Sequence, residues 1–140
     1  MPRILLISLI AYAAVGLTLS LGLHLLSFST IRVTGADAAS FAVPLALFPL
    51  FLAAVLVWTK LSQIETPLRP SAGAIVLPGC PAWLRLTIRA LYFYVPVDFA
   101  IYLAWSFAGT PTHGLAPVWG LWMFLYAYAL MIFLVAWRRA

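Results

Sequence analysis

The sequence predicts an all-α integral membrane protein in which four transmembrane helices form an antiparallel bundle. Of its 140 residues, 66% are apolar and 8% are charged, whereas soluble domains carry roughly 25% charged residues. A globular chain of this length has too much surface for its volume to bury so many apolar side chains in one core. The composition therefore excludes an ordinary water-soluble domain, a disordered tail and a disulfide scaffold. A lipid bilayer is the expected partner.

Four stretches are long and apolar enough to be membrane spans, each of which takes about 20 residues. They are 4–28, 40–58, 86–108 and 117–137. Two short connections and one longer cytoplasmic loop, 62–82, join them. We therefore expect a single membrane domain that covers residues 1–140, without a separate soluble domain.

The first two spans lack charged side chains. The apolar run of 4–28 exceeds the roughly 7–15 residues of a secretory signal, so we expect a retained helix. Ser40 is positioned to cap the second helix, and Pro44 falls in or near its first turn. Pro49 lies deeper, so it should kink the helix and free the carbonyl of Leu45 for a partner on a neighbouring helix.

The loop 62–82 contains four prolines and cannot be helical throughout. Its apolar patch, 74–77, either covers the cytoplasmic mouth of the bundle or docks a cytoplasmic partner. Cys80 follows in a Pro-Gly-Cys-Pro turn. A lone cysteine forms no internal disulfide and supplies too few ligands for a metal, so we expect an unmodified thiol.

The third span differs from the others because it contains charged side chains. Arg89 lies near its start and Asp98 lies inside it. Pro96 also frees the carbonyl of Tyr92 one turn before the acid. The fourth span is uncharged and follows a tight turn, 109–114, so the last two helices should be antiparallel neighbours.

The basic residues indicate that both termini are cytoplasmic, because Lys and Arg collect in short cytoplasmic loops. Seven of the eight lie at the chain ends or beside the loop 62–82, and the opposite side holds only Arg32, accompanied by Asp37. The seven are Arg3, Lys60, Arg69, Arg85, Arg89, Arg138 and Arg139. Attraction to anionic headgroups accounts for the net charge of +5. Nucleic-acid binding is not expected, since the charges do not gather on one helix face.

Asp98 is the main candidate for a functional residue. A carboxylate in the hydrocarbon region costs roughly 3 kcal/mol or more, so it should face the bundle interior, be protonated, or both. Residues three, four and seven positions apart share a helix face. Four side chains are thereby placed beside Asp98, namely Tyr94, Ile101, Tyr102 and Trp105.

The first span offers a matching stripe in which Gly16, Ser20 and His24 recur at every fourth position. His24 and Asp98 differ in depth by about two helical turns or less. They are therefore expected within reach of each other, directly or through Ser20 or water. Three interpretations remain open: a polar clamp that fixes helix order, a proton- or ligand-handling site, and a tolerated polar residue.

The sequence offers little support for a bound cofactor or for an enzyme active site. His24 and His113 fall on the same side and could in principle ligate a b-type haem, but His113 lies in a turn, where an axial ligand is poorly positioned. Nucleotide-binding fingerprints, metalloprotease motifs and the hydrolase nucleophile elbow are all missing. We therefore predict no enzyme activity, no catalytic residue, no cofactor and no metal.

Three short segments carry a family resemblance: HLLSF at 24–28, PGCPAWLR at 78–85 and VDFA at 97–100. Together they resemble segments of small bacterial proteins with four transmembrane helices and unknown function. The resemblance covers most of the chain and implies a bacterial inner membrane. It implies no activity and assigns no role to any residue.

The leading functional expectation is a small non-catalytic membrane protein, an accessory or packing subunit that meets other membrane helices as a homo-oligomer or in a larger complex. The alternative is a small oligomeric transporter or proton-coupled carrier that uses Asp98 with Tyr94, Tyr102, His24 and Ser20. A haem- or quinone-binding electron-transfer subunit is the third possibility. The sequence names no substrate for any of them.

Overall fold

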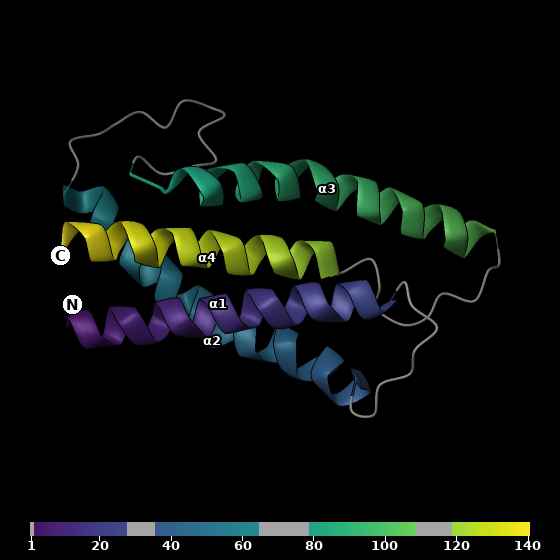
Figure 1. Cartoon of the computed structure of the whole chain (residues 1–140), viewed down its shortest axis with the longest axis horizontal. Helices are drawn as coiled ribbons and strands as arrows, with labels where there is room; N and C mark the ends of the chain where they lie inside the picture. The colour runs from purple at the N-terminus through teal and green to yellow at the C-terminus, as the bar shows by residue number, and fades with distance from the viewer. Residues whose placement is uncertain (1, 28–35, 65–78, 109–118) are drawn as a thin grey trace.

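A computed structural model of the protein describes residues 2–27, 36–64, 79–108 and 119–140 (Figure 1). These residues form four long helices: α1 (Arg3–Ser27), α2 (Ala36–Ile64), α3 (Ala82–Phe107) and α4 (Trp119–Arg139). All four are long and apolar enough to cross a membrane. The predicted all-helical class with four candidate spans is confirmed.

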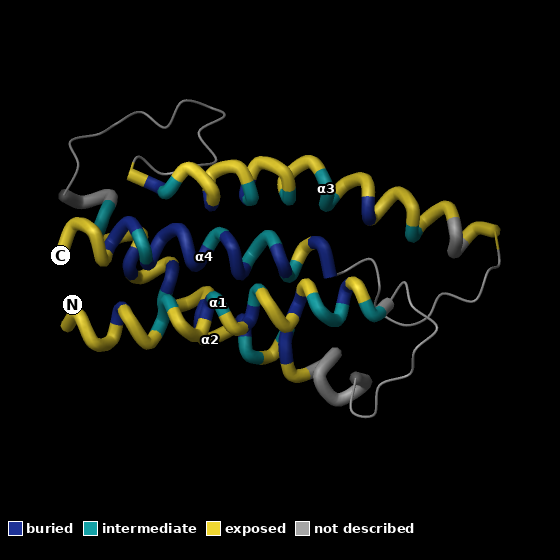
Figure 2. Tube along the Cα trace, in the orientation of Figure 1, coloured by how far each residue is buried: buried dark blue, intermediate teal, exposed yellow. Residues whose placement is uncertain are grey.

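Successive helices run in opposite directions, and the two ends of the chain lie at the same end of the molecule (Figure 1). Helix α4 occupies the centre, where it packs against α1, α2 and α3, and α1 also packs against α2. Two thirds of the α4 span (67%) is buried, against 11% of the α3 span. Figure 2 shows this contrast between the buried α4 and the exposed α3. Three helices thus surround a fourth that is apolar on nearly all sides.

Helix α2 is longer than the sequence analysis predicted. It begins at Ala36, so Ser40 lies inside the helix instead of capping it, and Pro44 joins Pro49 in the helix interior. The added residues are rich in alanine, the strongest helix former, which extends the helix beyond its apolar stretch. Helix α3 likewise begins at Ala82, earlier than expected. The apolar patch 74–77 lies outside the described residues.

Two tyrosines of neighbouring helices donate hydrogen bonds to the backbone of α2. Tyr12 of α1 donates a hydrogen bond to the carbonyl of Ala46 at 2.9 Å, and Tyr126 of α4 donates one to the carbonyl of Val43 at 2.7 Å. The predicted acceptor was the carbonyl of Leu45, which lies between them. The Leu45 side chain points outward and is 76% exposed. The neighbouring helices therefore bind the carbonyls on either side of this residue.

The outer surfaces of α1, α2 and α3 suit contact with lipid. Large apolar side chains are exposed along all three helices. The hydroxyls of Ser8, Thr18 and Thr87 each donate to the carbonyl four residues earlier in their own helix, at 2.9–3.1 Å. A hydroxyl satisfied in this way can face hydrocarbon without an unpaired donor.

Candidate functional site

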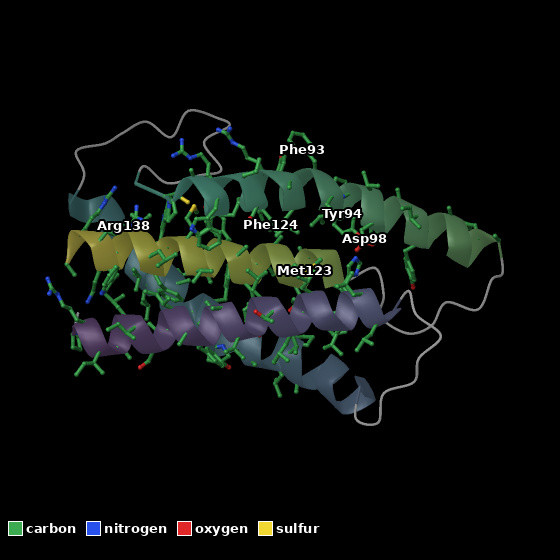
Figure 3. All side chains as sticks on the ribbon, in the orientation of Figure 1. Phe93, Tyr94, Asp98, Met123, Phe124 and Arg138 are labelled. Carbon is green, nitrogen blue, oxygen red and sulfur yellow. The ribbon has the colours of Figure 1, made fainter. Side chains whose placement is uncertain are left out.

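Asp98 faces the protein interior, as the cost of exposing an acid to lipid requires. Its side chain is 5% exposed. Figure 3 shows Asp98 and Tyr94 on the side of α3 that faces α4, whereas Phe93 points away from the molecule. Helix periodicity explains this arrangement, because Tyr94 and Asp98 are one turn apart and share a face.

Asp98 is linked to His24 through the hydroxyl of Tyr94. The hydroxyl oxygen of Tyr94 lies 2.6 Å from Nε2 of His24. The same hydroxyl donates to Oδ1 of Asp98 at 3.4 Å. The two rings meet edge to face, with centroids 5.6 Å apart. The sequence analysis expected a direct contact or a link through Ser20 or water, whereas the structure shows a link through Tyr94, whose long side chain reaches across to α1.

The first turn of α4 completes the site. Gly120 is its second residue, and a Cβ at this position would lie only 2.7 Å from Oδ2 of Asp98. The first backbone N–H groups of a helix have no partner within it, and they mark the positive end of the helix dipole. The N–H of Gly120 approaches the Asp98 carboxylate, although Oδ2 meets no donor at hydrogen-bond geometry among the described residues. The start of α4 therefore offsets part of the cost of burying a charged carboxylate here.

Ser20 is the most deeply enclosed polar side chain of α1. It is 0% exposed, and its hydroxyl oxygen has no hydrogen-bond partner among the described residues. A buried hydroxyl in this condition costs roughly 1–3 kcal/mol. Ser20 precedes His24 by one turn, so the polar stripe predicted for the first span faces the interior, but Ser20 does not join the His24–Tyr94–Asp98 chain.

Other residues placed beside Asp98 by spacing are not gathered there. Tyr102 is half-buried and contacts the ring of Phe99 on its own helix, and Ile101 is 44% exposed. This part of α3 extends past the start of α4, so α4 does not cover it (Figure 1). The side chain of Trp105 lies outside the described residues.

The contribution of α4 was not predicted from the sequence, because α4 adds a glycine and its backbone N–H to the site and no polar side chain. The available signal was Gly120 at the start of an uncharged span, since a glycine there lets another side chain approach the backbone.

A second polar cluster lies at the opposite end, beside the chain termini. Gly79 adopts a left-handed φ of 86° in the turn before α3. Its carbonyl accepts a hydrogen bond from Arg138 of α4 at 3.0 Å, and the carbonyl of Cys80 accepts one from Arg85 at 3.4 Å. Cys80 is buried, and this burial raises the pKa of its thiol, although Arg85 and Arg138 oppose the shift. The turn therefore joins the start of α3 to the end of α4 and holds a poorly ionised thiol.

Metal and haem ligation gain no geometric basis from the described residues. Within them, no group of three or more His, Cys, Asp or Glu side chains is placed to hold a metal ion. His113, the second histidine of the haem interpretation, lies outside the described residues. What the described site offers chemically is a set of exchangeable protons on an imidazole, a phenol and a carboxyl group.

No family model, curated protein or solved structure matches the chain. The resemblance to small bacterial four-span proteins therefore stays an expectation that rests on the three short segments.

Proposed function

We propose that the protein is a non-catalytic accessory or packing subunit of a bacterial inner-membrane assembly. The observation that supports this role is the unequal burial of the helices, since α4 is enclosed while α3 has 11% of its span buried. The described polar side chains of the site bond to one another within the protein. The surface left for partners is therefore apolar and lies on the outer helices.

The proposed orientation places both termini in the cytoplasm. Arg138 binds the turn before α3, which brings the basic C-terminal end beside Arg85 and Arg89 at the start of that helix. The N-terminus lies at the same end of the molecule (Figure 1). One end thus collects basic residues, as the cytoplasmic end of a membrane protein does.

The outer face of α3 is the proposed contact surface for other membrane helices. Leu86 and Phe93 are each 71% exposed and Val97 is 54% exposed on this face. Phe93 is the aromatic residue among them, and aromatic side chains supply much of the contact area where helices meet. Either a second copy of the chain or another membrane protein would cover it in the assembly.

Native electrophoresis of gently solubilised membranes tests the packing role. We expect the wild-type chain to migrate as a complex larger than the monomer, and Phe93→Ala to shift it toward the monomer. Val15→Ala is the matched control, because Val15 is 57% exposed on α1. A wild-type monomer, or equal behaviour of the two variants, would contradict the proposal.

A proton-coupled carrier is the second candidate, and the hydrogen-bonded chain from His24 through Tyr94 to Asp98 favours it. Vesicles that contain the purified protein and a pH-sensitive dye would test it. A proton flux that Asp98→Asn abolishes would support a carrier. An unchanged flux in this variant would remove Asp98 from the transport path.

A further inference from the structure

The hydroxyl of Tyr94 has one hydrogen but two neighbours that can accept it. One is Nε2 of His24 at 2.6 Å, and the other is Oδ1 of Asp98 at 3.4 Å. If the hydroxyl donates to Asp98, then Nε2 must carry a hydrogen and donate to Tyr94. If the hydroxyl donates to His24, then Asp98 must be protonated and donate to Tyr94. The same heavy-atom positions serve both arrangements.

We infer that His24, Tyr94 and Asp98 form a binding site for one proton, whose loss reverses the direction of this hydrogen-bond chain. In the loaded form, which has bound the proton, the protonated carboxyl group of Asp98 donates a hydrogen bond to the hydroxyl of Tyr94. This hydroxyl donates to Nε2 of His24, and the hydrogen of the imidazole ring is on Nδ1. In the unloaded form, Nε2–H of His24 donates to Tyr94, and Tyr94 donates to the carboxylate.

The protons balance between the two forms. The loaded site holds three: one on the imidazole, one on the phenol and one on the carboxyl group. The unloaded site holds two, on the imidazole and the phenol, and one proton has left for the solution. The imidazole stays neutral throughout, and its hydrogen moves from Nδ1 to Nε2. No bond other than O–H and N–H bonds is made or broken.

The surroundings make both forms accessible. Burial of Asp98 favours the loaded form, because that form carries no net charge. The first turn of α4 opposes this preference, since the N–H groups around Gly120 and the helix dipole stabilise the carboxylate. A site that used burial alone would hold its proton permanently. The α4 terminus gives the unloaded form a compensating interaction.

The other titratable groups around the site lie apart from the chain. Tyr126 of α4 and Tyr12 of α1 both donate to the α2 backbone. Tyr102 of α3 contacts the ring of Phe99. From the α2 side, the side chain of Asp37 is not among those described, and Arg32 and His113 fall outside the described residues. The proton site is therefore defined by three side chains from α1 and α3 and by the backbone of α4.

The protonation of this site can be followed by spectroscopy, because the sequence contains few other groups of the same kinds. The chain has three carboxylic side chains, Asp37, Glu65 and Asp98, and two histidines, His24 and His113. Infrared spectroscopy of the full chain in lipid would follow the carboxylic C=O band, which Asp98→Asn assigns by removing it. Nitrogen NMR of labelled histidine in a His113→Gln background would follow the protonated nitrogen of His24.

We expect the Asp98 band to disappear and the His24 hydrogen to move from Nδ1 to Nε2 at one common pH. In Tyr94→Phe the two events should separate, because the connecting hydroxyl is lost. Tyr102→Phe is the matched control on the same helix, and it should keep the common midpoint. Different midpoints in the wild-type protein, or a common midpoint that survives Tyr94→Phe, would overturn the inference.

The wild-type measurement decides the question even if Tyr94→Phe fails to fold, since a common midpoint with a change of tautomer is required in either case. The inference also stands apart from the packing role. A monomeric protein with a common midpoint would refute only the packing proposal, and an assembled protein with independent midpoints would refute only the proton site.

Discussion

The ring of Tyr126 in α4 occupies the space that Gly16 in α1 leaves open, so that any Cβ at Gly16 would overlap it. The hydroxyl of the same tyrosine reaches the carbonyl of Val43 in α2. One fully buried side chain, 1% exposed, therefore joins three helices. In a membrane, close approach and interhelical hydrogen bonds of this kind replace the hydrophobic effect as the source of association.

Replacing Gly16 by alanine should destabilise the protein. The added methyl group meets the Tyr126 ring, and overpacking of this kind costs about 1–3 kcal/mol. The measurement is the free energy of unfolding in detergent. Gly22→Ala is the matched control, because no atom lies within 4 Å of a Cβ at that helical position, and alanine should be neutral or slightly stabilising there. Equal effects at the two glycines would show that α1 and α4 do not meet as described.

Replacing Tyr126 by phenylalanine keeps the ring and removes the bond to Val43. Hydrogen bonds between membrane helices contribute about 0.6 kcal/mol on average and up to roughly 1.7 kcal/mol. We expect a loss of unfolding free energy in this range, measured as for Gly16. Tyr128→Phe serves for comparison, because the Tyr128 hydroxyl makes no hydrogen bond to the described residues. Removing this hydroxyl should lower the free energy of unfolding by less than removing that of Tyr126. A larger loss at Tyr128 would argue against the bond to α2.

The helices were predictable from sequence because length and apolar content alone determine them. The all-helical class and the four candidate spans required only counting. The start of α2 was not predictable in this way, since the helix begins in an alanine-rich segment that precedes the apolar stretch. The central position of α4 was also hidden. The spans of α1 and α2 are more apolar than that of the buried α4, and the span of the exposed α3 is less apolar. Apolar content therefore does not distinguish a helix surrounded by protein from one surrounded by lipid.

The sequence predicted the contacts of the candidate site that lie within one helix, and it did not predict those that depend on how the helices pack. Spacing placed Tyr94 beside Asp98 correctly, because both lie on one helix. It placed Tyr102 there as well, since periodicity cannot show where the neighbouring helix ends. The link to His24 was expected, but its route through Tyr94 depends on how α1 and α3 are packed. Backbone groups such as the N–H of Gly120 carry no signal in a search for polar side chains.

Asparagine and leucine at Asp98 should have different effects on folding. Asp98→Asn keeps an acceptor for the Tyr94 hydroxyl and nearly the same volume, so we expect unfolding free energy and assembly close to wild type. Asp98→Leu removes every acceptor and leaves the N–H groups at the start of α4 and the Tyr94 hydroxyl without this neighbour. Losing a buried partner costs roughly 1–3 kcal/mol.

Unfolding in detergent, with native electrophoresis for assembly, would separate these outcomes. Two equally stable variants would mean that the polar contacts of Asp98 do not hold α3 against α4. A large loss of unfolding free energy in Asp98→Asn, without a similar loss in Asp98→Leu, would instead indicate that the negative charge itself is needed beside the start of α4.

The thiol of Cys80 should react slowly at neutral pH. Its burial raises the pKa above that of an ordinary thiol, and the thiolate is the reactive form. Alkylation of the folded protein should therefore be slower than alkylation of the unfolded chain at the same pH, and its rate should rise as the solution becomes more alkaline.

Because the folded state holds the proton of the Cys80 thiol more tightly than the unfolded state does, the free energy of unfolding should fall as the pH rises through about 8.5, where free thiols ionise. Cys80→Ala should remove both the labelling and this part of the alkaline loss. Rapid labelling of the folded protein at pH 7 would show that the turn before α3 opens readily and that its bonds to Arg85 and Arg138 do not hold it closed.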